Sequence, residues 1–157
     1  MKLNGKFFPF EEDRKENDPE RDFPIKQSMR DFSGKEREFE IKYHDAGLGF
    51  IVDAIEKVKG DGGYHFSAFD TSSPYIALGK IRDKMRRRLS TRHVYKEKGR
   101  YYPSHDTIRG RITSSDGSDV IFVVDGIPLS LHQLGKMANM YEGWEFMLKF
   151  IDRGDDD

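Results

Sequence analysis

Two histidine–aspartate pairs carry the side chains in this sequence that most directly suggest catalysis or metal binding. They are His44–Asp45 and His105–Asp106, and a further histidine, His65, falls in a segment expected to be a strand. Imidazole and carboxylate groups bind divalent metals, and a bound metal activates water for hydrolysis. Brought together, these five side chains would support a metal-dependent hydrolase. Both pairs fall in loops or at strand ends, however, where histidines are mostly surface or turn residues, so we expect no metal and no cofactor.

A second pattern with catalytic chemistry is Glu40-Ile41-Lys42. On a strand, residues two apart lie on the same face, and metal-dependent nucleases use such a Glu–Lys pair to hold Mg²⁺ and activate water. The additional acid would have to come from Asp22 or Asp31. The apolar residues that alternate with this pair would occupy the buried face, so the pattern predicts that the pair simply faces solvent. A metal-dependent hydrolase or nuclease is therefore kept as the alternative function.

The largest candidate binding surface is the basic segment at residues 80–111. It contains twelve Lys or Arg and three acidic residues, a local net charge of +9. Arginine binds phosphates and carboxylates as a bidentate fork, and aromatic rings stack on unpaired bases; proteins that bind single strands combine the two. The same charges could instead solvate a helix and pair with the chain's own acids. The residues predicted to form this basic and aromatic face are Lys84, Arg86, Arg87, Arg88, Arg92, Tyr95, Arg100, Tyr101, Tyr102, Arg109 and Arg111.

The C-terminal third has the opposite charge. Residues 112–157 hold nine acidic and three basic residues, a net of −6, and the whole chain has a net charge of −1. Dedicated nucleic-acid binders are usually basic overall, so two partners stay open, nucleic acid and an acidic protein surface. The acidic region of another copy is one such surface and would produce a homo-oligomer. The predicted function is a non-catalytic binding or regulatory domain that docks an acidic macromolecule through its basic face.

Composition indicates a folded chain. Only 36% of the 157 residues are hydrophobic and 35% are charged, yet aromatic residues make up 13%, more than disordered chains usually carry. The absence of cysteine excludes disulfides, thiolate metal sites and a cysteine nucleophile. No apolar run approaches the ~20 residues of a membrane span, and the first ten residues are too interrupted for a signal peptide. We therefore expect a cytoplasmic protein that does not act on membranes.

Hydrophobic periodicity predicts the elements that would position these side chains. Strict alternation from residue 36 indicates a half-buried strand, and a second strand is expected over residues 63–69. Between them, apolar residues at helical spacing predict a helix over residues 47–59. A Ser-Pro pair marks the start of another helix at 74–89, whose apolar stripe would leave its lysines and arginines in solvent.

The remaining elements are short. Strands linked by turns are expected at 91–96, 100–103, 107–113 and 120–124. Ser130 and Gln133 predict a capping box and a third helix, which Gly143 would end. Alternating apolar residues then predict a last strand over 144–150, with Trp144 packed on the core.

The predicted fold class is α+β. Hairpin-linked strands favour an antiparallel arrangement, so we expect a mixed or mainly antiparallel sheet of about five to seven strands with three helices in a single domain. Residues 1–35 are expected to form a charged N-terminal arm with short packed segments. Residues 36–152 would form the single α+β domain, and residues 153–157 an acidic frayed tail.

Overall fold

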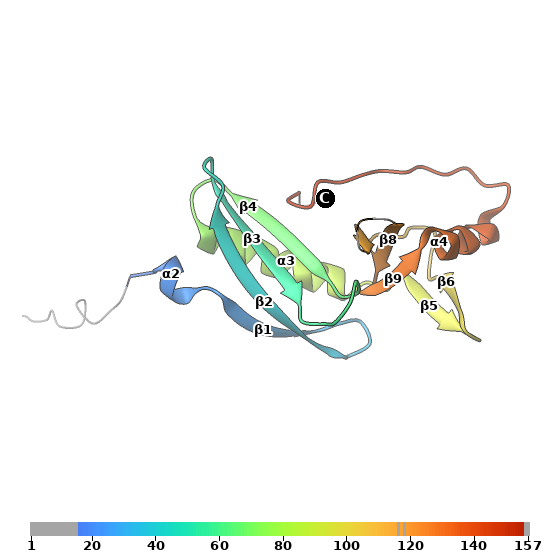
Figure 1. Cartoon of the computed structure of the whole chain (residues 1–157), viewed down its shortest axis with the longest axis horizontal. Helices are drawn as coiled ribbons and strands as arrows, with labels where there is room; N and C mark the ends of the chain where they lie inside the picture. The colour runs from blue at the N-terminus through green and yellow to red at the C-terminus, as the bar shows by residue number, and fades with distance from the viewer. Residues whose placement is uncertain (1–15, 116, 118, 156–157) are drawn as a thin grey trace, which may run out of the picture.

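A four-stranded antiparallel sheet forms the N-terminal half of the chain (Figure 1) in the computed structural model, which describes residues 16–115, 117 and 119–155. Its strands lie side by side in chain order as β1 (Ile25–Arg30), β2 (Glu36–Asp45), β3 (Phe50–Glu56) and β4 (His65–Asp70). Alternation along β2 was predicted and is confirmed, with Phe39 and Ile41 fully buried. The strand predicted at 63–69 is confirmed as β4.

Helix α3 (Pro74–Leu89) covers one face of this sheet, and the predicted bounds and cap are confirmed. The Ser73 hydroxyl accepts a hydrogen bond from the backbone N–H of Tyr75, and Pro74 occupies the first turn, where no intrahelical donor is lost. Ile81, Met85 and Leu89 are fully buried against alternate residues of β2, β3 and β4. Each such side chain contributes about 1.5–3 kcal/mol through burial.

The helix predicted over residues 47–59 is wrong, because this segment forms β3. A helix would have buried Leu48 and Val58, which are 89% and 47% exposed. The segment instead buries alternate residues, Val52, Ala54 and Glu56, and pairs antiparallel with β2 and β4. The β-branched residues in β3 suit a pleated surface, and two strand neighbours satisfy its backbone groups.

The C-terminal half contains five short strands and one helix. β5 (Val94–Glu97) and β6 (Arg100–Pro103) form a hairpin, and β7 (Arg111–Ser115), β8 (Asp119–Val124) and β9 (Ile127–Ser130) form an antiparallel meander. The predicted turns at 98–99 and 125–126 are confirmed; both residues of each turn have positive φ, as tight hairpins require. The predicted capping box of Ser130 and Gln133 begins α4 (Leu131–Ala138), which the 3₁₀ turn η1 (Asn139–Tyr141) follows. A second, smaller core consists of Val94, Val124, Leu129 and Met137.

The α+β class and the antiparallel pairing are confirmed, but the single sheet of about five to seven strands is not. The described residues form nine strands in three sheets of four, two and three strands, with three α-helices, and they do not confirm a single domain. Within the predicted N-terminal arm, residues 16–35 contain α2 (Pro19–Asp22) and β1, and residues 1–15 lie outside the described residues. None of the helices in the described residues combines the length and apolarity needed to cross a membrane.

Some boundaries in the C-terminal half differ from the prediction. The strand expected at 107–113 begins only at Arg111, and Ile112 is 53% exposed, so it does not share a buried face with Ile108. The strand expected at 144–150 is absent: the described residues after η1 are extended but pair with no other strand. Trp144 is 67% exposed and packs edge-on against Tyr141 at 5.0 Å, not on a core. No strand among the described residues pairs with this segment, so alternation alone did not produce a strand.

Candidate functional site

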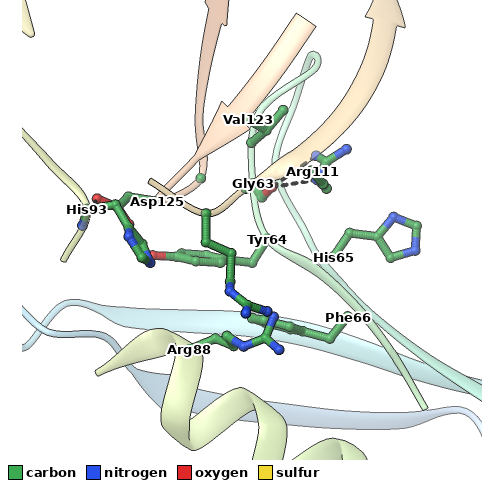
Figure 2. Close-up of a pocket in the computed structure, with 12 residues that line it drawn as sticks. Gly63, Tyr64, His65, Phe66, Arg88, His93, Arg111, Val123 and Asp125 are labelled. Carbon is green, nitrogen blue, oxygen red and sulfur yellow. Dashed lines mark hydrogen bonds between the residues drawn. The ribbon is translucent and has the colours of Figure 1, made fainter. Parts of the chain in front are cut away.

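A pocket rich in charged side chains lies where the N-terminal sheet and the C-terminal meander meet (Figure 2). It is a pocket of about 80 Å³. The start of β4, the last turn of α3, the segment before β5 and the β7–β9 meander all contribute to its wall. The lining residues include three arginines, two histidines and one aspartate: Arg88, Arg109, Arg111, His65, His93 and Asp125. Positive side chains therefore outnumber negative ones three to one among the lining residues.

Arg111, the first residue of β7, lines the pocket with a guanidinium group bound only to neutral acceptors. Its Nε and Nη2 donate to the backbone carbonyl of Gly63 at 3.2 and 2.9 Å, and Nη2 also donates to the carbonyls of Asp61 and Gly62. No carboxylate in the described part of the chain forms an ion pair with it. Burial lowers the pKa of Arg111, and the charge of Asp61 opposes this only in part. Arginine nevertheless stays protonated at neutral pH, so this half-buried charge lacks a counterion within the described residues.

Tyr64 contributes a hydroxyl group without a hydrogen-bond partner in the described residues. Its ring stacks on the Phe66 ring with 5.6 Å between ring centres. The Arg37 guanidinium lies 4.9 Å from the centre of the Tyr64 ring. Figure 2 shows this ring extending across the pocket toward His93 and Asp125. Burial, followed by the charge of Asp125, raises the pKa of the Tyr64 hydroxyl. The hydroxyl is therefore protonated at neutral pH and can donate a hydrogen bond.

Asp125 fixes the remaining wall of the pocket. It is 5% exposed, and its Oδ2 accepts hydrogen bonds from the backbone N–H groups of His93 (2.8 Å) and Val94 (2.9 Å). The carboxylate thus joins the β8–β9 turn to the start of β5. Because Oδ2 already accepts two backbone hydrogen bonds, this oxygen of Asp125 has a structural role. The three lining arginines outnumber this one carboxylate.

The predicted basic face does not form one surface. Three of its arginines line the pocket, as described above. Arg86 and Arg87 are exposed on α3, and Arg86 pairs with Asp83 at 2.7 Å.

A separate row of stacked side chains, called here the ladder, lies on the β5–β6 hairpin and consists of Arg92, Tyr95, Tyr102 and Arg100. Tyr95 and Tyr102 stack at 5.5 Å, with Arg92 5.9 Å from the Tyr95 ring and Arg100 5.5 Å from the Tyr102 ring. Tyr101 lies across the sheet from Lys96, whose ammonium is 5.3 Å from the ring. The side chains available for stacking therefore already contact cations of the same chain.

Lys84 was predicted to be exposed on the basic face, and this is wrong. It is 2% exposed, and its ammonium donates to the carbonyl oxygens of Ser67 (2.7 Å), Arg153 (3.0 Å) and Asp155 (2.6 Å). Lys84 follows Ile81 by three residues, so it shares the buried face of α3. Its charge binds carbonyls of Arg153 and Asp155, which belong to the segment expected to fray; residues 156–157 of that segment lie outside the described residues.

Replacing Lys84 by methionine should release residues 152–155 from α3. The substitution keeps the apolar stem but leaves the Ser67 carbonyl without its donor, which costs about 1–3 kcal/mol. Hydrogen–deuterium exchange should show faster exchange in residues 152–155. Arg87→Met, an exposed change on the same helix, is the control. Unchanged exchange in the Lys84 variant would contradict the assignment.

The metal-site hypothesis is not supported by the placement of its residues. The part of the chain that is described contains no group of three or more His, Asp or Glu side chains able to hold a metal ion. His65 lies 4.0 Å from Asp53, and burial lowers the pKa of His65. His105 packs on His93 at 5.4 Å, whereas His44 and Asp45 end β2 in the other half of the chain.

The nuclease pattern is likewise not assembled. Glu40 and Lys42 contact each other at 3.5 Å on the face of β2 opposite the buried residues, as predicted for a pair that faces solvent. Asp31 binds Arg37, and Asp22 accepts a hydrogen bond from the Tyr75 hydroxyl. Neither acid is available beside Glu40.

The sequence analysis did not identify Tyr64 and Asp125 as site residues. Asp125-Gly126 was predicted only as a turn. The local sequence does not distinguish an aspartate that accepts hydrogen bonds from distant N–H groups from an ordinary turn aspartate. For Arg88 a signal existed, because it follows Ile81 by seven residues and therefore shares its face of α3.

Two family models match the chain on either side of the connection between α3 and β5. Residues 21–90 match a model described as "Domain of unknown function (DUF7686)", and residues 93–155 match "Domain of unknown function (DUF7713)". No curated protein and no solved structure matches the chain. The junction between the matched regions falls beside His93, so the pocket draws residues from both of them.

Proposed function

We propose that this chain is a non-catalytic binding module that receives an oxyanion, a phosphate or carboxylate group of an acidic macromolecule, in the pocket lined by Arg88, Arg109 and Arg111. The observation that carries the proposal is Arg111, a half-buried charge that binds only backbone carbonyls among the described residues. The Tyr64 hydroxyl, buried and unpartnered among the described residues, supports it. A cytoplasmic location belongs to the proposal, since a chain without cysteine suits a reducing compartment.

An oxyanion would provide both a negative charge for the three lining arginines and a hydrogen-bond acceptor for the Tyr64 hydroxyl. Hydrogen bonds between charged partners are stronger than neutral ones, and a partly buried position reduces screening by water and salt. A cavity of about 80 Å³ suits a single compact group better than a nucleobase or a whole peptide.

The wider surface supports a macromolecular partner. Arg86 and Arg87 are exposed on the helix that carries Arg88, and the Arg92–Tyr95–Tyr102–Arg100 ladder begins one residue from the pocket residue His93. Phosphates or carboxylates spaced along a partner would meet these cations while one group occupies the pocket. Such contacts would make binding depend on salt.

Fluorescence anisotropy at two salt concentrations tests the proposal with a single-stranded oligonucleotide in one arm and an acidic peptide in the other. We expect binding in one arm that weakens with salt. Tyr64→Phe removes only the donor and should weaken binding about tenfold, the value of a hydrogen bond to a charged group. Tyr141→Phe, a tyrosine outside the pocket, is its control.

Arg111→Met should weaken binding at least as much and should reduce the salt dependence by about one counterion in the oligonucleotide arm. Lys42→Met is the control for loss of one positive charge, because Lys42 lies on β2 away from the pocket. Circular dichroism confirms that each variant is folded. Absence of binding in both arms at low salt, or binding that neither pocket variant changes, would overturn the proposal.

A further inference from the structure

Residues 144–151, called here the strap, form an extended segment between η1 and the end of the described chain (Figure 1). Six of its eight residues are large and apolar, and they are exposed to an unusual degree: Trp144 67%, Phe146 90%, Met147 90%, Leu148 70%, Phe150 72% and Ile151 37%. A continuous exposed apolar surface marks an interaction site. The strap therefore lacks a cover within the described residues.

Both ends of the strap are fixed. At its start, the backbone N–H of Trp144 donates to the Tyr141 carbonyl at 2.9 Å, and the two rings pack edge-on. Beyond its end, the Lys84 ammonium binds the carbonyls of Arg153 and Asp155. Between these anchors, residues 145–151 make no backbone–backbone hydrogen bond with any described residue. The strap thus presents extended N–H and C=O groups in a fixed position, which is the form in which a chain pairs with another strand.

The sequence of the strap is complementary to itself when it is read antiparallel about Met147. Residue pairs whose numbers are symmetric about 147 then lie opposite each other. Glu145 of each copy lies opposite Lys149 of the other, so the ribbon contains two pairs of opposite charge. Trp144 lies opposite Phe150, Phe146 lies opposite Leu148, and Met147 lies opposite its counterpart in the second copy, so these pairs are apolar. Aromatic, aliphatic and opposite-charge cross-strand pairs are the ones that stabilise a ribbon.

We propose that the strap is a self-association element that pairs with the strap of a second copy in an antiparallel ribbon, with the two-fold axis at Met147. A two-fold contact uses the same residues on both copies and closes at two chains. Four apolar side chains from each copy, at positions 144, 146, 148 and 150, share one face of the ribbon. This proposal is independent of the anion pocket, because no strap residue lines it.

Analytical ultracentrifugation of the full chain over a concentration series tests the proposal. We expect a monomer–dimer equilibrium that Phe146→Asp abolishes; this residue is 90% exposed, so the variant should stay folded. Glu145→Lys and Lys149→Glu each place like charges opposite one another and should raise the dimer dissociation constant roughly threefold or more. The double variant Glu145→Lys/Lys149→Glu restores opposite charges and should recover dimerisation. Glu36→Lys, on β2, is the matched charge control.

A cysteine pair tests the register directly, since the natural chain has no cysteine. Met147→Cys places two thiols opposite each other on the axis and should give a disulfide-linked dimer under mild oxidation. Lys149→Cys places its thiols apart, opposite position 145, and should cross-link far less. A monomer at every concentration, a dimer that Phe146→Asp leaves intact, or no recovery in the double variant would each overturn the proposal.

Discussion

Replacing Arg37 by alanine is expected to destabilise the folded chain by about 3–5 kcal/mol, the cost of leaving buried charges without their partner. Arg37 Nε contacts Asp31 at 2.9 Å and Nη1 contacts Glu56 at 3.0 Å, and the two carboxylate side chains are only 1% and 5% exposed. The guanidinium also lies over the Tyr64 ring. The substitution therefore uncovers two buried carboxylates and removes one wall support of the pocket.

Chemical denaturation measures this loss, and Arg86→Ala is the control. Arg86 and Asp83 are 61% and 69% exposed, and exposed pairs contribute little, so the control should change stability by less than about 0.5 kcal/mol. Equal losses in the two variants would contradict the assignment of Arg37 as a central charge.

The same cluster gives the natural chain an acid-dependent stability. Burial acts to raise the pKa of Asp31, but hydrogen bonds from Ser33 and Arg37 outweigh it and keep the pKa below its ordinary value. A lowered folded-state pKa stabilises the fold above the unfolded pKa of about 3.9, and this contribution is lost as pH falls from there through the folded value. The Arg37→Ala variant should show less of this acid-dependent loss.

Asp125→Ala should destabilise the chain by about 2–4 kcal/mol. The variant leaves the buried N–H groups of His93 and Val94 without an acceptor, at about 1–3 kcal/mol for an unsatisfied buried group. It also places alanine at φ +54°. This left-handed conformation costs roughly 1–2 kcal/mol for residues other than glycine, asparagine or aspartate.

Two companion variants separate these causes under thermal or chemical denaturation. Asp125→Gly relieves only the backbone strain, whereas Asp125→Asn keeps an acceptor oxygen and tolerates the positive φ. We expect Asp125→Asn to lose the least stability, Asp125→Ala to lose the most, and Asp125→Gly to lie between them. The Asp125→Asn variant should also bind the oxyanion more tightly, because it removes the one carboxylate among the described lining residues. Weaker binding by this variant would count against an anion site in the pocket.

The sequence predicted the elements whose signals are local. Helix α3 was predicted to its bounds because a serine cap, a proline and an apolar stripe all lie within it. β3 was not, because its apolar residues fit both the helical and the strand period, and only pairing with β2 and β4 decides between them. The 144–150 segment shows the converse: alternating apolar residues are insufficient, because a strand also needs a partner strand, and none among the described residues pairs with this segment.

The candidate site was predictable only as a region. Charge density marked residues 80–111, but it could not tell Lys84, which faces inward, from Arg87, which faces solvent. The pocket combines residues 63–66 with residues 123–126, and their approach depends on how the two halves pack. Tyr64 therefore carried no sequence signal of its role.

The pocket is also the joint between the two halves, and this links occupancy to cooperative unfolding. The Gly63 N–H donates to the Gly126 carbonyl at 2.7 Å, and Arg111 holds the carbonyls of residues 61–63, so the contacts that fasten the meander to the sheet surround the cavity. An anion seated there would bridge both halves, and any ligand that binds only the assembled state raises the melting temperature through mass action. A partner bound there would thereby oppose the separate unfolding of the two halves.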